Sequence, residues 1–191
     1  MAPARVFSKW IVAALLSLFL VAPVTAQETG VAPPRTLDTM FADLLTAEPR
    51  VARRIEREIW NVWSKSGSAT ADLLLQRGRE AMREGKLDAA IDHLTALVDH
   101  APDFTEGWNA RATAYFQAGL YGPSVADIAE VLKREPRHFG ALAGFGAILE
   151  ATGKEAEALE VYKAALAIHP HLAGIGSAVA RLELKRSGQN L

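Results

Sequence analysis

The chain of 191 residues contains no cysteine, and this absence excludes several kinds of site at once. Disulfides, thiolate zinc sites and cysteine nucleophiles all need the missing thiol. A lipoprotein anchored through a lipid-modified cysteine is excluded for the same reason. The folded chain must therefore be stabilised by packing.

The chain also lacks an excess of positive charge, with 21 lysines and arginines against 22 aspartates and glutamates. Two of the basic residues, Arg5 and Lys9, precede an apolar run near the N-terminus. The sequence beyond that run is therefore net acidic. Because nucleic-acid binding relies on basic surfaces, we predict no nucleic-acid partner.

The N-terminal apolar run, Trp10 to Val21, is too short for a comfortable membrane span. It is preceded by basic residues and followed by Pro23 and the small-residue ending Val24-Thr25-Ala26, as in a secretory signal. We predict a signal peptide over residues 1–26, cleaved after Ala26, and a periplasmic or secreted protein with no stable membrane span. Retention of the segment as an anchor is the alternative. Residues 27–36, which include two adjacent prolines, are predicted to form a flexible leader.

Motifs for catalysis are missing as well. No serine stands in a recognisable setting with a base, and no pair of carboxylates lies in a predicted strand-framed pocket. Gly140, Gly144 and Gly146 fall inside a predicted helix with no strand before it, so they do not form a nucleotide-binding loop. We predict neither an enzyme nor a cofactor.

What the sequence does contain is a period of 34 residues. Three prolines keep it, and three glycines keep it in phase with them: Pro102, Pro136 and Pro170, and Gly85, Gly119 and Gly153. The repeating unit resembles the tetratricopeptide repeat (TPR), a helix-turn-helix of this length. The resemblance implies an all-α, right-handed solenoid of antiparallel helix pairs.

The register of the repeats agrees with this resemblance. A TPR expects small residues at its eighth and twentieth places and bulky residues at its fourth, eleventh and twenty-fourth. With units over residues 71–104, 105–138 and 139–172, the small places hold Gly78 and Ala90, Ala112 and Ser124, and Gly146 and Ala158. The bulky places fit except at Ala81. We predict a helical hairpin at 37–67 before the units and a capping helix at 173–187 after them.

The hairpin carries two tryptophans, Trp60 and Trp63, beside four arginines. One interpretation is that both tryptophans pack on the first helix of the first repeat, as in a solenoid cap. The other is a partly exposed aromatic patch that serves as a second interface for docking or self-association. Adsorption to a membrane surface is a further alternative, although Glu56 and Glu58 dilute the charge of the helix.

In the TPR family the first helix of each unit lines a concave groove, and the resemblance carries those places over to this chain. The predicted groove residues are Arg79, Met82, Arg83, Asn109, Thr113, Phe116, Gln117, Arg181 and Lys185. A peptide segment of a partner protein is the ligand that such a groove implies. A clamp for acidic chaperone tails is not implied, because its positions hold Leu75, Arg79, Ala110, Gly140 and Gly144.

Histidines occur near the turns between repeats, at His100, His138, His169 and His171. Imidazole binds zinc and copper, but equivalent turns of neighbouring repeats lie about 10 Å apart, too far to share one ion. We therefore predict no metal site. The leading functional hypothesis is a non-enzymatic adaptor in the bacterial envelope. The alternatives are a homo-oligomeric scaffold assembled through Trp60 and Trp63 and, more weakly, a histidine-based metal-binding accessory protein.

Overall fold

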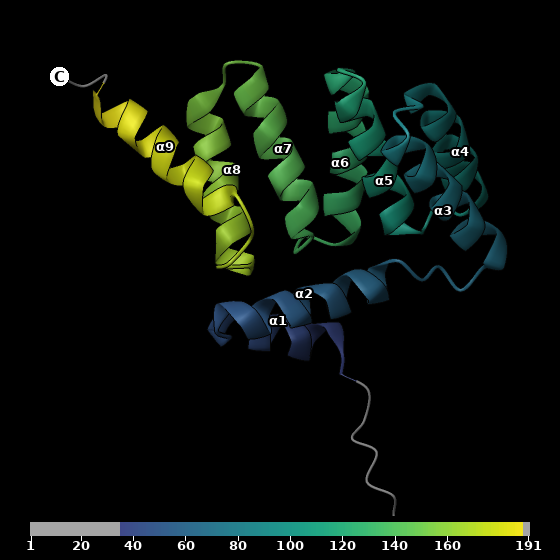
Figure 1. Ribbon diagram of the computed structural model, residues 1–191, viewed down its shortest axis with the longest axis horizontal. Helices are drawn as coiled ribbons and strands as arrows, with labels where there is room; N and C mark the ends of the chain where they lie inside the picture. Colours follow the sequence, from purple (N-terminus) through teal and green to yellow (C-terminus); the bar gives the residue numbers. More distant parts are fainter. Residues whose placement is uncertain (1–34, 189–191) are drawn as a thin grey trace, which may run out of the picture. The chain divides into compact units, whose positions relative to one another are not determined.

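A computed structural model describes residues 35–188, and the predicted signal peptide lies outside this part of the chain. The described residues form helices and no strand, as the resemblance implied (Figure 1). The helices are α1 Leu37–Thr46, α2 Pro49–Trp63, α3 Ala69–Arg83, α4 Leu87–His100, α5 Thr105–Gln117, α6 Tyr121–Arg134, α7 Phe139–Ala151, α8 Glu155–Ile168 and α9 Ile175–Gly188.

Three antiparallel helix pairs, α3/α4, α5/α6 and α7/α8, stack side by side, and α9 packs on α8 (Figure 1). The periodic glycines separate the helices of each pair. Gly85, Gly119 and Gly153 have φ angles of 73°, 73° and 77°, which glycine adopts without the steric cost that other residues meet. The backbone then turns back on itself, and Lys86 N donates to Ala81 O at 2.9 Å to close the end of α3.

The small residues of the repeat allow the two helices of a pair to cross closely. A Cβ atom added to Gly78 would lie 2.4 Å from the Leu94 side chain, and one added to Gly146 would lie 2.4 Å from the Tyr162 ring. Ala90, Ser124 and Ala158 at the twentieth places have no exposed surface, and the Ser124 hydroxyl donates to a backbone carbonyl of α5 at 2.7 Å. The packing places inferred from the sequence are confirmed.

The N-terminal hairpin forms because α1 and α2 are each apolar along one side. Thr36 caps α1 by accepting from Thr39 N at 3.2 Å, and Pro49 occupies the first turn of α2, where its missing N–H is not needed. The apolar sides hold Met40, Phe41 and Leu44 in α1 and Ala52, Ile55, Ile59 and Trp63 in α2, all buried.

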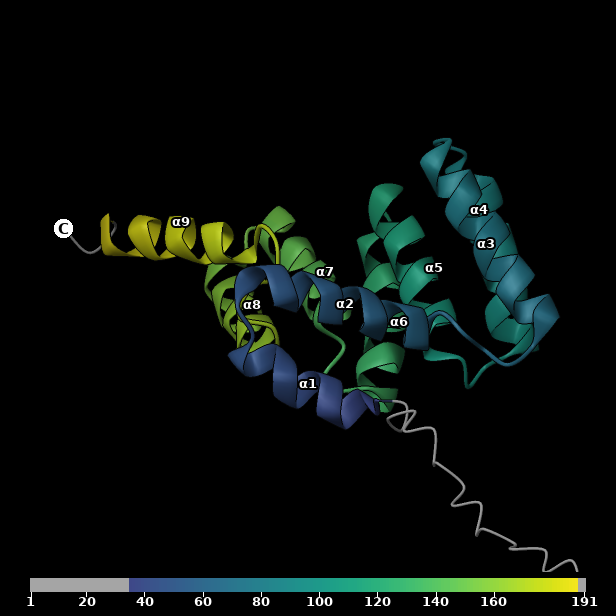
Figure 2. The same cartoon turned by 60° about the horizontal axis from the view of Figure 1, so that its bottom comes forward.

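The place of this hairpin corrects one expectation. The tryptophans do not pack on α3 as in a stacked cap. The apolar face of the hairpin instead covers Phe139 at the start of α7, with Ile168 at the end of α8 and Leu172 in the turn after it. Figures 1 and 2 show α1 and α2 running along the edge of the array, with α2 on the side of α3, α5 and α7. Arg137, which donates to Asp38 at 2.7 Å, adds a polar tie to α1.

Candidate peptide-binding groove

The first helices of repeats two and three border a cavity of about 240 Å³. Asn109, Thr113 and Phe116 of α5 line one side, and Gly140 and Gly144 of α7 line the other. The Trp60 ring covers Gly140, where it would lie 2.7 Å from an added Cβ atom, whereas a Cβ atom at Gly144 would meet only Ile128 at 3.9 Å. The surface of α7 is therefore open to an approaching chain at Gly144. This cavity is the centre of the candidate groove.

Three of the predicted groove residues therefore lie together. Thr113 is exposed, and its hydroxyl donates to the Asn109 carbonyl at 2.9 Å. Phe116 is half-buried against Tyr121, with ring centroids 5.8 Å apart. Asn109 is only 9% exposed, and its amide donates to Glu106 at 3.1 Å. The surface offered to a ligand is thus one aromatic ring, one hydroxyl and bare backbone.

The other six predicted residues lie outside this cavity. Gln117 is exposed at the end of α5, and Met82 packs against the core of repeat one. The four basic residues Arg79, Arg83, Arg181 and Lys185 are all held in ion pairs, with Glu106, Glu80, Glu150 and Glu155 respectively. The basic groove ends that the sequence indicated are therefore neutralised by neighbouring carboxylates.

The ion pair between Arg181 of α9 and Glu150 of α7 also affects the pKa of the glutamate. The Arg181 guanidinium, 2.6 Å from the carboxylate, holds the pKa of Glu150 below its ordinary value. Burial raises the pKa of Tyr162 to about 12, and the neighbouring Glu150 adds to the effect. Both groups therefore keep one charge state at neutral pH.

A buried polar network closes the end of the groove near the hairpin. Glu106 is 2% exposed and accepts from Arg79 and Asn109. His138 has no exposed surface; its Nδ1 accepts from Ala141 N at 3.1 Å, and its Nε2 lies 3.3 Å from Glu106. The neutral ring must then carry its proton on Nε2 and donate it to Glu106. This network was not predicted from the sequence, in which its one available signal is a carboxylate, Glu106, in the first turn of α5.

The hairpin tryptophans complete this end. The Trp63 ring stacks on His138 with centroids 4.1 Å apart and an angle of 10° between the planes, and Trp63 is 8% exposed. Trp60 is half-buried, edge-on to Phe139 at 5.5 Å. Trp63 is therefore covered in the docked hairpin, whereas Trp60 keeps part of its surface exposed. A second interface through these two residues stays a prediction.

The remaining predictions concern metal and membrane. Between residues 35 and 188, no three histidine, aspartate or glutamate side chains are arranged to hold a metal ion. His138 and His169 are buried, and His171 lies 3.1 Å from the carbonyl of Ala47 in the hairpin. Within the same range, no helix is both long and apolar enough to cross a membrane.

Comparison with known proteins agrees with this architecture. A family model described as tetratricopeptide repeat matches residues 75–123 and 124–173. A TPR repeat-containing protein of Rhizobium etli is 40% identical over 158 residues, covering 78% of each chain.

Solved structures share the fold at lower identity. The TPR domain of Sgt2 from Aspergillus fumigatus is 20% identical with a TM-score of 0.60, covering 64% of this chain and 83% of its own. The first TPR domain of Spaghetti (RPAP3), solved with the HSP90 peptide SRMEEVD, is 24% identical with a TM-score of 0.59, covering 63% and 95%. The repeat packing and these matches together show that this chain belongs to the tetratricopeptide repeat family.

Proposed function

We propose that this protein is a non-enzymatic adaptor of the bacterial envelope that binds a peptide segment of a partner protein in the groove between α5 and α7. The observation that carries the proposal is the cavity bordered by Thr113 and Phe116 on one helix and by Gly140 and Gly144 on the other. An aromatic ring opposite an accessible backbone suits a peptide, which offers both side chains and main-chain groups.

The comparisons support a peptide as the class of ligand. Spaghetti (RPAP3), which shares the fold, was solved with a bound peptide. The ligand of this chain must be a different one, because the positions of the acidic-tail clamp hold Leu75, Ala110, Gly140 and Gly144 beside Arg79. Leu75 and Ala110 are moreover buried and cannot reach a ligand.

A substitution that fills the groove tests the proposal. A Cβ atom at Gly144 would meet only ordinary contact, 3.9 Å from Ile128, so Gly144→Leu adds a side chain beside the cavity with little strain on the fold. The matched control is Gly122→Leu in α6, where nothing lies within 4 Å. Affinity capture from envelope extract, read by mass spectrometry, should yield a protein that the parent and Gly122→Leu retain and Gly144→Leu loses. Equal capture by all three would contradict binding in this groove.

The envelope location rests on the sequence of residues 1–26, with basic residues, an apolar run and a small-residue ending. Expression of the full chain with a C-terminal tag, followed by cell fractionation and mass measurement, tests it. The expected product begins at Gln27 and is found outside the cytoplasm. A full-length product that stays in the cytoplasm would contradict the location without touching the groove.

A further inference from the structure

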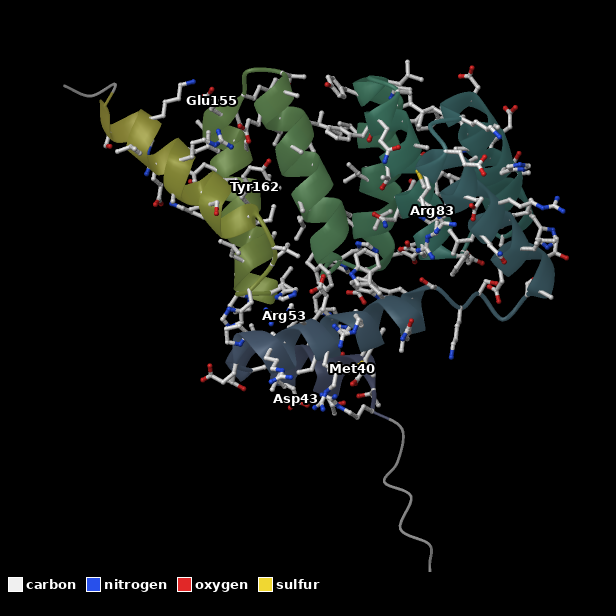
Figure 3. The ribbon with its side chains drawn as sticks, viewed as in Figure 1. Met40, Asp43, Arg53, Arg83, Glu155 and Tyr162 are labelled. Atoms are coloured by element: carbon white, nitrogen blue, oxygen red, sulfur yellow. The ribbon has the colours of Figure 1, made fainter. Side chains whose placement is uncertain are left out.

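The hairpin helix α2 carries arginines along one face. Four of them occupy positions i, i+3, i+4 and i+7, which share one face of an α-helix: Arg50, Arg53, Arg54 and Arg57. All four are exposed. The buried residues of α2 lie on the opposite face: Ala52, Ile55, Ile59 and Trp63. Figure 3 shows Arg53 on the side of α2 away from Met40 of α1. The basic face therefore points away from the core of the hairpin.

The glutamates of α2 leave most of this charge in place. Glu56 lies 3.4 Å from the buried His169, and Glu58 accepts from Arg35 at 2.8 Å. Within residues 35–188, Arg54 is the one arginine of the four in an ion pair, with Glu58 at 3.8 Å. In the sequence the two glutamates dilute the charge of the helix, but in the fold each has a partner on another element. Three guanidinium groups therefore remain available to a ligand.

The space between the arginines is open. The four arginines and Val51 surround a hollow of about 420 Å³, and no other described element lines it. A peptide would find no groove or sheet edge here that fixes its path. A flat surface needs neither, because it meets a whole helix face at once. Val51, which is 41% exposed, adds an apolar side chain among the charges. The shape of this face therefore favours an extended surface over a single bound chain.

We propose that α2 docks on an anionic lipid bilayer, with Arg50, Arg53 and Arg57 on the lipid phosphates. Guanidinium groups bind phosphate through charge-assisted hydrogen bonds. A basic helix that lies on a membrane is held by anionic lipids and by the apolar side chains that it buries. Val51 is the one apolar residue of the hollow, so the attraction is mainly electrostatic. The protein then binds the membrane at its surface and reversibly.

The place of the hairpin along the chain also fits a membrane partner. The predicted signal peptide ends at Ala26, and α1 begins at Leu37. A short leader thus separates the hairpin from the segment that is predicted to enter the membrane during export. This step rests on the proposed envelope location, whereas the attraction between the arginines and lipid phosphates does not depend on it.

Co-sedimentation with lipid vesicles tests the proposal. One set of vesicles contains phosphatidylglycerol and phosphatidylcholine at a ratio of roughly 1:2, and the other contains phosphatidylcholine alone. The second set controls for apolar adsorption, including that of residues 1–26 in an unprocessed chain. Each basic residue near an anionic surface strengthens binding roughly fivefold, so three should give a preference of about a hundredfold for the anionic vesicles. The preference should fade as salt rises from about 0.1 to about 0.5 M.

The variant Arg50→Gln/Arg53→Gln/Arg57→Gln should lose this preference, and the corresponding lysine variant should keep most of it, because a bilayer responds to charge. The matched control, Arg77→Gln/Lys133→Gln/Arg186→Gln, makes the same charge change at exposed residues of α3, α6 and α9 that make no ion pair in residues 35–188. It should weaken binding less than about threefold, since separated charges are screened by salt. Unchanged circular dichroism and thermal unfolding would show that each variant is folded.

A label on the basic face reports which side of the molecule meets the lipid. Asn61 lies about three turns after Arg50 on the same face of α2, and Ala96 lies in α4; both are exposed. An environment-sensitive fluorophore on Asn61→Cys should be quenched by spin-labelled lipid headgroups in anionic vesicles. The same fluorophore on Ala96→Cys should not be quenched.

Several results would overturn membrane docking. These are equal binding to both kinds of vesicle, an unchanged preference in the glutamine variant of α2, and an equal loss in the control variant. Loss of binding in the lysine variant, or polyglutamate bound as tightly as the anionic vesicles, would assign the arginines to an acidic protein instead. Gly144→Leu should bind vesicles as the parent does, so membrane docking and the peptide groove can fail separately.

Discussion

At the scale of single residues, His169 gives the fold a dependence on pH. It has no exposed surface, it packs edge-on against Phe139 at 5.1 Å, and Glu56 and His171 are the titratable groups near it. Burial lowers the pKa of His169 more than Glu56 raises it. The unfolded chain therefore takes up this proton more readily than the folded chain does.

The sign of the effect follows from that difference. The free energy of unfolding is not reduced by His169 at pH values above the pKa of this histidine in the unfolded chain, about 6.5. Below that pKa it falls as the pH drops, by up to about 1.4 kcal/mol per pH unit for one group. We predict that His169→Gln reduces this acid loss in urea unfolding between pH 7 and pH 5. His100→Gln, at an exposed position, should leave the loss as in the parent. An unchanged slope in His169→Gln would assign the acid sensitivity to other groups.

Two glycines of α7 provide a matched pair. A Cβ atom at Gly146 would stand 2.4 to 3.0 Å from the Tyr162 ring, which is buried and whose hydroxyl lies 3.3 Å from Glu150. Gly146→Ala should lower the free energy of unfolding by about 1–3 kcal/mol, because the ring must move. Gly144→Ala, one half-turn earlier, meets only contact at 3.9 Å and should raise it by up to about 1 kcal/mol through helix propensity. Urea unfolding measures both, and equal values would contradict the close helix crossing.

At the scale of elements, the hairpin is held by a small aromatic cluster. Trp63 stacks on His138 and contacts Phe139, with ring centroids 5.1 Å apart in the second pair. We predict that Trp63→Ala releases α1 and α2 and lowers the free energy of unfolding by about 3–5 kcal/mol. Hydrogen exchange should rise over residues 37–63 while α3 to α6 stay protected.

Val62→Ala is the control for this experiment, since Val62 lies next to Trp63 in α2 but is 41% exposed. Its effect on stability should be within about 0.5 kcal/mol. If exchange in Trp63→Ala rose evenly over all helices, the hairpin would be part of one cooperative core rather than a separately docked element.

The repeats could be predicted from the sequence because their determinants are local and recur. Gly85 and its equivalents mark turns a few residues from the helices they end, and Gly78 and Leu94 meet within a single unit. The place of the hairpin could not be predicted, because it depends on contacts such as Asp38 with Arg137, which are 99 residues apart. No period links such residues.

The candidate site was accessible to prediction only in part, for the same reason. Places within the repeat indicated Asn109, Thr113 and Phe116, which lie together. They could not show that Arg79 is held by Glu106 and Arg181 by Glu150, since these partners sit on other helices. The sequence shows which charged residues a surface can contain, but ion pairs between helices decide which of these charges remain available to a ligand.

At the scale of the whole described chain, the hairpin contacts both repeat one and repeat three, which are not neighbours in the array. In a solenoid each repeat contacts its neighbours, so bending accumulates along the array. Here Ser64 binds Arg79 in repeat one, Trp63 stacks on His138 before repeat three, and α1 contacts α8. We infer that this strap, α1 with α2, fixes the curvature and hence the width of the groove.

The absence of cysteine makes this inference directly measurable, since labels can be introduced without removing native thiols. Spin labels on Arg77→Cys in α3 and Arg186→Cys in α9 report the distance along the array. We predict a narrow distribution in the parent and a broader one when Trp60→Ala/Trp63→Ala is added. Labels on Arg77→Cys and Ala126→Cys, in adjacent repeats, should keep the same width in both. If the long distance were equally narrow without the tryptophans, the repeats alone would set the curvature, and hairpin release would leave the groove unchanged.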